Sequence, residues 1–173
     1  VKLARIYLAW PTPPLHAKGD AEMDIIASVL SSGKSSRLYK PLVYEQKLAK
    51  DVAAFQLSRF LGSVFVVQAT VAPGKSVAEL EAALAKALEE ALATPPSEDE
   101  LARVVNGWRK SFYGRVEAVL SRAQLLSTYW HSTGKADYLA EDLARYTELD
   151  AATVHAAAKR WLPLDKALRI DIE

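Results

Sequence analysis

The sequence predicts an α+β fold, a two-layer sandwich in which a mostly antiparallel sheet of about four strands carries helices on one face. The segments run in the order strand, two helices, strand hairpin, about five helices, strand, which is neither the alternation of a doubly wound sheet nor a helical bundle. Half of the 173 residues are hydrophobic, and no repeat or low-complexity linker divides them. We therefore expect residues 1–173 to form a single domain with a substantial core.

The first strand is predicted over Leu3–Trp10, where apolar and polar residues alternate. Its apolar face consists of Ile6, Leu8 and Trp10. Asp20 is expected to cap a helix that runs to Leu30, and Gly33 stands where a left-handed residue would end it. A second, shorter helix is predicted from Ser35 or Ser36 to about residue 47.

Residues 50–72 change to the period of strands, with a break at 59–62, and so predict an antiparallel hairpin. Alternation returns at 167–173, where Leu168, Ile170 and Ile172 lie opposite Arg169 and Asp171. We expect both terminal strands to join the hairpin in one sheet.

Two capping boxes predict the starts of the next helices, because a Ser and a Glu three residues later can satisfy each other's backbone N–H groups. The pairs are Ser76 with Glu79, and Ser97 with Glu100. Helical patterns follow over about 119–130 and 138–146, and Asp150 is expected to cap a last helix through Trp161.

Composition argues against several classes of function. Twenty-two Lys and Arg balance 21 Asp and Glu, and the signs are interspersed, so we expect no nucleic-acid partner. Cysteine is absent, which excludes thiol chemistry and thiolate zinc sites in this chain. No apolar run approaches the ~20 residues of a membrane span, and no secretory signal is recognisable near Val1. The start at Val1 suggests a segment of a longer chain.

Metal ligands are not predicted. The three histidines, His16, His131 and His155, are too far apart in sequence to share a helical turn, so neither H-E-x-x-H nor H-x-x-E-H occurs. The run 32–35 (SGKS) resembles the end of a phosphate-binding loop, but the first glycine is missing and the preceding segment is helical. A turn that ends one helix before the next begins is the better interpretation of this run.

Other polar and aromatic residues are first interpreted as structural. Asp20, Glu22 and Asp24 suit the N-terminus of a helix better than a pair of acid-base carboxylates. The sequence contains no G-x-S-x-G motif of the kind that exposes a serine nucleophile. Packing or rim positions are expected for Arg37, Tyr39 and Tyr44. A stripe of core residues is expected for Trp108, Phe112 and Tyr113.

The segment 31–49, SSGKSSRLYKPLVYEQKLA, closely resembles a signature of the insulinase/pitrilysin-type zinc peptidases, the inverzincins that include mitochondrial processing peptidase. Four further segments occur in the family's order, so that the resemblance covers essentially the whole chain: Asp20-Ala21-Glu22, Phe65–Gly74, Pro95–Leu101 and Tyr146–Leu162.

The resemblance implies the second, C-terminal domain of a peptidase half. In the family, two halves enclose a chamber, and the H-x-x-E-H zinc motif lies in the first domain, so zinc is expected there and no cofactor here. The opposite half carries an Arg/Tyr pair that holds the substrate carbonyl. The aligned positions here are Val43 and Lys50, so no catalytic or metal-binding residue transfers to this chain, and its substrate-binding residues are unknown.

The resemblance therefore predicts a non-catalytic domain that forms a chamber wall of a zinc metalloendopeptidase and is inactive alone. Its expected partners are the H-x-x-E-H-bearing domain of the same chain, a second half with the Arg/Tyr pair, and peptides. One alternative is a scaffold role, as in core subunits of respiratory complexes. Another is an independent small-molecule enzyme, which predicts a deep pocket with converging polar groups. The cellular location is unknown, and a periplasmic site in a bacterium is an expectation from the family alone.

Overall fold

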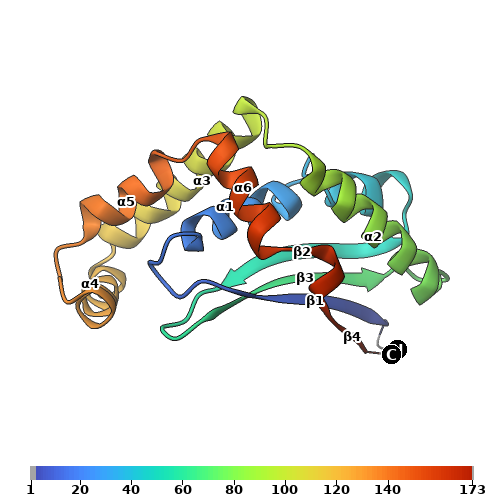
Figure 1. Ribbon diagram of the computed structural model, residues 1–173, viewed down its shortest axis with the longest axis horizontal. Coiled ribbons are helices and arrows are strands. Elements are labelled where there is room, and N and C mark those ends of the chain that lie inside the picture. The colour runs from blue at the N-terminus through green and yellow to red at the C-terminus, as the bar shows by residue number, and fades with distance from the viewer. Residues whose placement is uncertain (1–2, 173) are drawn as a thin grey trace.

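The strands form one antiparallel sheet in the order β2-β3-β1-β4 (Figure 1). A computed structural model of the chain describes residues 3–172. The strand bounds are β1 Arg5–Thr12, β2 Ala49–Leu57, β3 Ser63–Val71 and β4 Leu168–Ile172. The first and last strands are thus neighbours, as expected, although Glu173, where the last predicted strand ends, lies outside the described residues.

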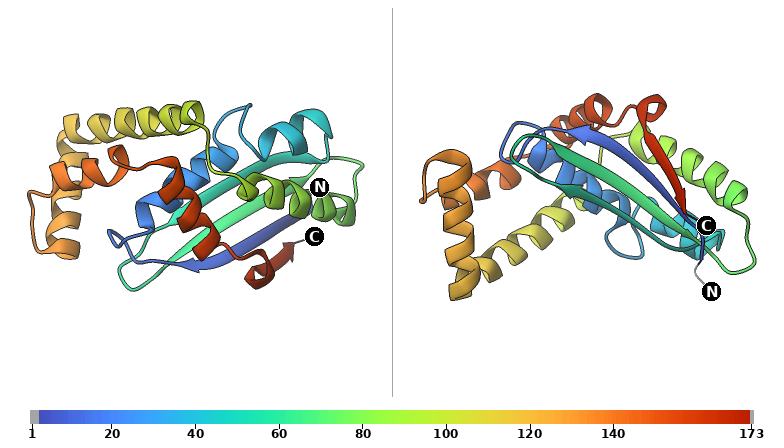
Figure 2. Two further views of the ribbon diagram at one scale, coloured as in Figure 1. Left: turned by 45° about the horizontal axis from the view of Figure 1, so that its top comes forward. Right: turned by 90° about the horizontal axis from the view of Figure 1, so that it is seen from below.

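The helices all cover the same side of the sheet, and α3, α4 and α5 extend beyond one end of it (Figures 1 and 2). Their bounds are α1 Asp20–Ser31, α2 Val77–Ala93, α3 Glu98–Glu117, α4 Val119–Thr133, α5 Leu139–Thr147 and α6 Ala151–Trp161. Short helical turns are η1 Lys40–Glu45 and η2 Leu164–Lys166. This arrangement confirms the predicted α+β two-layer fold.

The predicted caps of α2, α3 and α6 are present. The hydroxyl of Ser76 accepts a hydrogen bond from the Glu79 N–H at 3.1 Å, and the Glu79 carboxylate accepts the Ser76 N–H at 3.0 Å. Ser97 and Glu100 repeat this geometry at 3.2 and 2.8 Å. Asp150 accepts the Thr153 N–H at 2.6 Å. Each bond satisfies a helix N–H that otherwise lacks an intrahelical partner.

The prediction that Asp20 caps α1 is wrong. The N-cap is Gly19, whose φ of 105° suits glycine, and the Gly19 N–H donates to the Glu22 carboxylate at 3.0 Å. Asp20 is instead the first helical residue, and its buried carboxylate forms an ion pair with Arg145. An ionic partner 125 residues away is invisible in local sequence patterns.

The second predicted helix is shorter than expected, and its regular part is the π-helical turn η1. The residues before it are held against the end of α1, since the N–H groups of Arg37 and Leu38 donate to the carbonyls of Val29 and Leu30. Those bonds to α1 divert the chain from a helix beginning at Ser36. Lys47, with a φ of 54°, follows the turn in a left-handed conformation.

The core lies between the sheet and the helices, and the helix-facing side chains of β1 and β3 form one side of it. Ile6, Trp10 and Phe65 are almost completely buried there. The edge of the Trp10 ring packs against Phe65, and its indole N–H donates to the Pro163 carbonyl at 2.9 Å. Burying a large apolar side chain contributes about 1.5–3 kcal/mol, so these positions account for much of the stability.

Strand β4 differs from β1 and β3, because its apolar side chains point away from the helices. In the sheet register Leu8 lies opposite Arg169, and Tyr7 opposite Ile170. Directly opposed side chains share one side of a sheet, so Arg169 lies on the helix side with Leu8. Leu168, Ile170 and Ile172 consequently remain 62%, 49% and 54% exposed.

Candidate functional site

One largely apolar surface is the side of the sheet that the helices leave uncovered, which we call the open face. The strand registers place the same alternate residues of all four strands on it. Its apolar members are Tyr7, Ala9, Pro11, Ala53, Phe55, Leu57, Val64, Val66, Leu168, Ile170 and Ile172.

Several apolar side chains on the open face remain accessible to water, although Val66 is buried. Leu57 and Val64 are each 40% exposed at the hairpin end, and the side chains of β4 are exposed further. The opposite end is polar, where Arg5 donates to the Thr70 hydroxyl at 2.9 Å and Thr70 donates to Asp51 at 2.8 Å. A large apolar patch bordered by polar groups is typical of a surface that another polypeptide covers.

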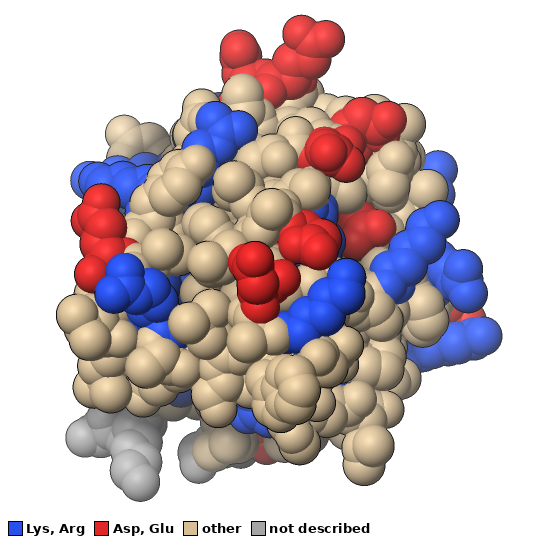
Figure 3. Space-filling view, turned by 90° about the vertical axis from the view of Figure 1, so that its left-hand side faces the viewer, with Lys and Arg blue, Asp and Glu red and all other residues tan. Residues whose placement is uncertain are grey.

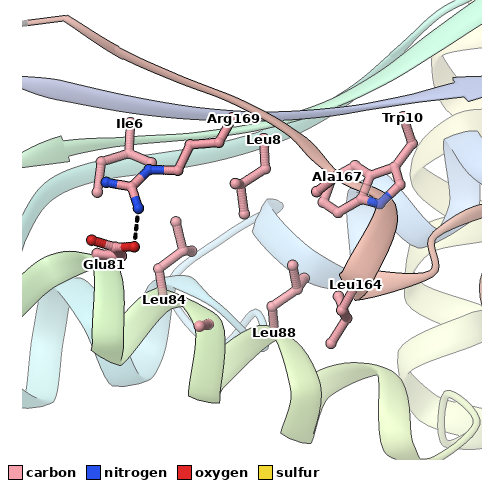
Figure 4. Close-up of a pocket in the computed structure, with 10 residues that line it drawn as sticks. Ile6, Leu8, Trp10, Glu81, Leu84, Leu88, Leu164, Ala167 and Arg169 are labelled. Atoms are coloured by element: carbon pink, nitrogen blue, oxygen red, sulfur yellow. Dashed lines mark hydrogen bonds and ion pairs between the residues drawn. The ribbon is translucent and has the colours of Figure 1, made fainter.

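A separate cavity of about 150 Å³ lies on the helix side, between β1, β4 and α2 (Figure 4). Its lining is aliphatic and aromatic, with Trp10 at one end. At the other end the Arg169 guanidinium forms an ion pair with Glu81. The polar groups of Arg169 and Glu81 thus satisfy each other at this end of the cavity.

The three histidines lie in separate environments. The ring nitrogen Nδ1 of His16 is 2.9 Å from the Ser132 hydroxyl, and burial, aided by Arg145, lowers its pKa. His131 packs edge-on against Phe60, and His155 Nε2 lies 3.0 Å from the Leu92 carbonyl oxygen. Within residues 3–172, no three His, Asp or Glu side chains are arranged to hold a metal ion.

A buried polar network joins α1 to α4 and α5. Arg145 donates to Asp20 at 2.7 Å and to Asp142 at 2.8 Å, and Asp142 accepts the Tyr129 hydroxyl at 2.6 Å. Asp20 also accepts the Ser58 hydroxyl at 2.6 Å. Because Arg145 bridges the two carboxylates and each carboxylate has a further donor, this network stabilises the helix layer.

The carboxyl group of Asp24 lies beside this network and differs in its electrostatics. Burial raises its pKa to about 6, although the hydrogen bond from the Tyr146 hydroxyl, at 2.6 Å, opposes that shift. Tyr146 in turn stacks on Trp108 at a centroid distance of 3.6 Å. Asp20 and Asp24 therefore have structural partners, as the sequence interpretation favoured. Most of these partners are distant side chains, but Asp20 also accepts the backbone N–H of His16 at 2.9 Å.

Arg37 has a structural role at the junction of α2 and α3. Its guanidinium donates to both carboxylate oxygens of Glu100, at 2.9 and 2.7 Å. It also donates to the carbonyls of Ala91, Thr94 and Pro95, at 2.6, 2.9 and 2.9 Å. The hydrogen bonds from Arg37 hold the pKa of Glu100 at about 2. One arginine thereby satisfies the end of one helix and fixes the start of the next.

The remaining candidates are mostly structural in the way the sequence suggested. Residues 32–35 form a turn after α1, in which Gly33 has a φ of 87°. Trp108 and Phe112 stack at 5.1 Å as a core stripe, whereas Tyr113 is 49% exposed. Tyr39 packs against the core, but Tyr44 is exposed.

Charged side chains are intermingled at the end of the molecule where α4 and α5 lie (Figure 3). On that view Lys and Arg alternate with Asp and Glu among neutral residues. None of the helices within residues 3–172 combines the length and apolar character that crossing a bilayer requires.

Residues 1–107 match the family model described as the peptidase M16 inactive domain. The chain belongs to the peptidase M16 family, as its inactive domain. This confirms the resemblance to the insulinase-type zinc peptidases and to their C-terminal domains. No curated protein sequence matches the chain.

Solved structures similar to this M16 domain share its fold at low sequence identity. The inactive peptidase domain of a candidate zinc protease from Bordetella parapertussis has a TM-score of 0.89 and 21% identity, over 99% of this chain and 91% of that one. A protease from Helicobacter pylori has a TM-score of 0.88 and 20% identity, over 100% of this chain and 42% of that one. Complex III2 from Candida albicans includes a chain with a TM-score of 0.79 and 13% identity, over 99% of this chain and 43% of that one.

The positions aligned with the family's Arg/Tyr pair do not form a pair in this M16 domain. Val43 lies in η1 and packs against the core, and Lys50 is an exposed residue of β2. The open face, by contrast, is not predicted by any motif in the sequence. Apolar and polar residues alternate clearly over 167–173, which predicts a strand with one apolar side. The alternation does not tell which side of that strand faces the helices.

Proposed function

We propose that this M16 domain is a non-catalytic structural domain of a zinc metalloendopeptidase, which supports the zinc-bearing domain and forms a wall of the chamber in which peptides are cleaved. Zinc and the H-x-x-E-H motif would belong to the partner domain. The M16 domain would supply shape and a docking surface, and it would neither bind metal nor hydrolyse peptides alone.

The open face is the observation that carries this proposal. Helices cover one side of the sheet, and the opposite side presents apolar side chains such as Leu57 and Val64, each 40% exposed. Removing such surface from water contributes about 25 cal/mol per Å², which favours a permanent partner. The Helicobacter pylori protease, of which this chain covers 42%, contains more than one such length of polypeptide. That larger size supports an occupant from the same assembly.

The first experiment tests catalysis. The 173-residue chain is assayed alone, and then together with the polypeptide that carries the H-x-x-E-H motif, for bound zinc and for cleavage of an unstructured peptide. We expect zinc and chelator-sensitive cleavage only when the second polypeptide is present. Stoichiometric zinc and turnover with the chain alone would contradict the proposal.

A second experiment tests the open face. Val64→Lys places a charge on this face and is expected to weaken the association with the zinc-bearing polypeptide by about tenfold or more, because a buried unpaired charge costs several kcal/mol. Leu61→Lys is the matched control, since Leu61 is 98% exposed at the hairpin tip outside the strands. Equal affinities for the two variants would exclude the open face as the docking surface.

The scaffold role is the second candidate, and the similarity to a chain of Complex III2 from Candida albicans supports it. In that case the same open face would hold a partner without any H-x-x-E-H motif. The partner's sequence therefore distinguishes the two roles: the motif supports the peptidase, and its absence supports the scaffold.

A further inference from the structure

The outer edge of β4 is open for pairing. Strand β4 is last in the sheet order and pairs only with β1. Within residues 3–172, the backbone of Leu168–Ile172 has no hydrogen-bond partner outside β1. An edge strand of this kind presents a row of free N–H and C=O groups to any extended segment that can approach it.

The opposite edge of the sheet is protected. The Ser31 hydroxyl accepts the Ala54 N–H at 2.8 Å and also contacts the Ala54 carbonyl at 3.2 Å, so it occupies backbone groups of β2 that no strand uses. A register irregularity between Ala49 and Asp51 interrupts the same edge further along. Natural proteins commonly protect sheet edges by such means. Within residues 3–172, no side-chain hydrogen bond occupies the outer backbone groups of β4 in this way, and its protection is limited to its short length and to Arg169 and Asp171.

The sequence of β4, LRIDI, is complementary to itself in one antiparallel register. If two copies pair about a twofold axis at Ile170, Leu168 lies opposite Ile172 of the other copy, and Arg169 lies opposite Asp171. Directly opposed residues share one side of a sheet. The aliphatic residues would then form a continuous row on the open face, and the charged residues would meet on the helix side.

The charged side chains that would meet in this register are already paired with each other within one chain. Arg169 donates to Asp171 at 3.0 and 2.5 Å, and both side chains remain partly exposed. In the paired edge, two arginines and two aspartates would alternate in sign, so each Arg169 would gain a second Asp171. The register also covers part of Leu168 and Ile172, which are 62% and 54% exposed in one chain.

We propose that two copies of this chain pair through the outer edges of their β4 strands, antiparallel and centred on Ile170, and so join their sheets into one continuous sheet. The interface is isologous, because each copy contributes the same five residues. This self-association goes beyond the proposed function, and neither depends on the other.

The test exchanges the charges. All variants carry Glu81→Gln, which removes the partner of Arg169 on α2 without altering the edge. Arg169→Asp makes the edge entirely acidic, and Asp171→Arg makes it entirely basic. Mass is measured by sedimentation velocity over a range of concentrations, and circular dichroism checks that each variant is folded.

We expect the Glu81→Gln reference to form a species of twice the mass of one chain. Each single charge variant should raise the dissociation constant of this dimer by about tenfold or more, since like charges oppose each other in both symmetric contacts. An equimolar mixture of the acidic and basic variants should restore the dimer, and so should Arg169→Asp combined with Asp171→Arg.

Three results would overturn the proposal. The first is a reference that is monomeric at every concentration, which would leave the edge to an extended segment of another protein or to none. The second is a single variant that dimerises as tightly as the reference. The third is a mixture of the two single variants that stays monomeric, because the charges would then not set the pairing.

Discussion

Arg37 lies between two helices and donates hydrogen bonds to side-chain and backbone groups of both the end of α2 and the start of α3. Replacement by Lys retains the charge but cannot reproduce a planar fork that reaches Glu100 and three carbonyl groups. We expect Arg37→Lys to lower the free energy of unfolding by about 2 kcal/mol in urea denaturation. Arg103→Lys is the control, because Arg103 makes one exposed hydrogen bond, to Ser35. A similar loss in both variants would contradict the role assigned to Arg37.

Asp24 is expected to make stability depend on pH. Burial raises its pKa from 3.8 to about 6, so between these values the folded chain holds a proton that the unfolded chain has released. The free energy of unfolding therefore falls as pH rises through this window, by up to about 3 kcal/mol for two pKa units. Asp24→Asn removes the titration but keeps an oxygen for the Tyr146 hydroxyl. We expect the variant to lose less stability than the parent chain between pH 4 and 7.

The measurement compares urea denaturation of the two chains at several pH values. The difference between them is the quantity to follow, because the lowered pKa of His16 makes stability depend on pH with the opposite sign. Its pKa is lowered by burial, so the neutral form is favoured in the fold and stability falls as pH decreases. Parallel pH profiles for Asp24→Asn and the parent chain would show that Asp24 does not carry the effect.

Residue-level prediction from sequence worked where the partner is local. The Ser76 and Ser97 capping boxes involve residues three positions apart, so the pattern alone identifies them. The prediction for Asp20 was wrong for the opposite reason, since its partner Arg145 becomes a neighbour only after α5 packs on α1. The role of Arg37 was similarly hidden, because the carbonyls that it satisfies lie more than 50 residues away.

At the scale of elements, the start of α1 depends on a glycine. Gly19 has a φ of 105°, and a Cβ there would lie 2.9 Å from both Pro13 Cγ and Trp161 Nε1. We expect Gly19→Ala to destabilise the chain by about 2–3 kcal/mol in thermal or urea denaturation. Gly33→Ala is the matched control, with a φ of 87° but no atom within 4 Å of the added Cβ, so about 1 kcal/mol is expected. Equal losses would mean that the close contacts at Gly19 are relieved at no cost.

The type and order of the elements could be predicted because hydrophobic periodicity and caps are local signals. Which side chains of β4 face the helices could not be predicted in this way. Its alternation is as regular as that of β1, and the usual rule would turn Leu168 and Ile170 toward the core. The register with β1 decides otherwise, and it places Arg169 beside Glu81 on α2. A one-residue change in register would reverse both faces, so only the tertiary pairing settles the question.

On the scale of the whole molecule, the layered architecture followed from the sequence, but the candidate site did not. The residue types in the sequence that could serve catalysis are His16, His131, His155 and the acidic residues of α1, and the structure places them in separate packing or network roles. The open face is a property of the assembled sheet, and no short motif encodes it. The family resemblance predicted a docking role for the chain, but not the surface that would perform it.

The open face and the β4 edge lie in different directions, which gives a final prediction. A partner on the open face approaches perpendicular to the sheet, whereas a second β4 strand approaches in its plane. Val64 lies on β3, separated from β4 by β1. Val64→Lys should therefore weaken binding of the zinc-bearing polypeptide and leave the dissociation constant of the β4 dimer within about twofold. Arg169→Asp in the Glu81→Gln chain should do the reverse. Sedimentation of each variant, with and without the partner, measures both equilibria, and a variant that abolishes both would show that the two surfaces are one.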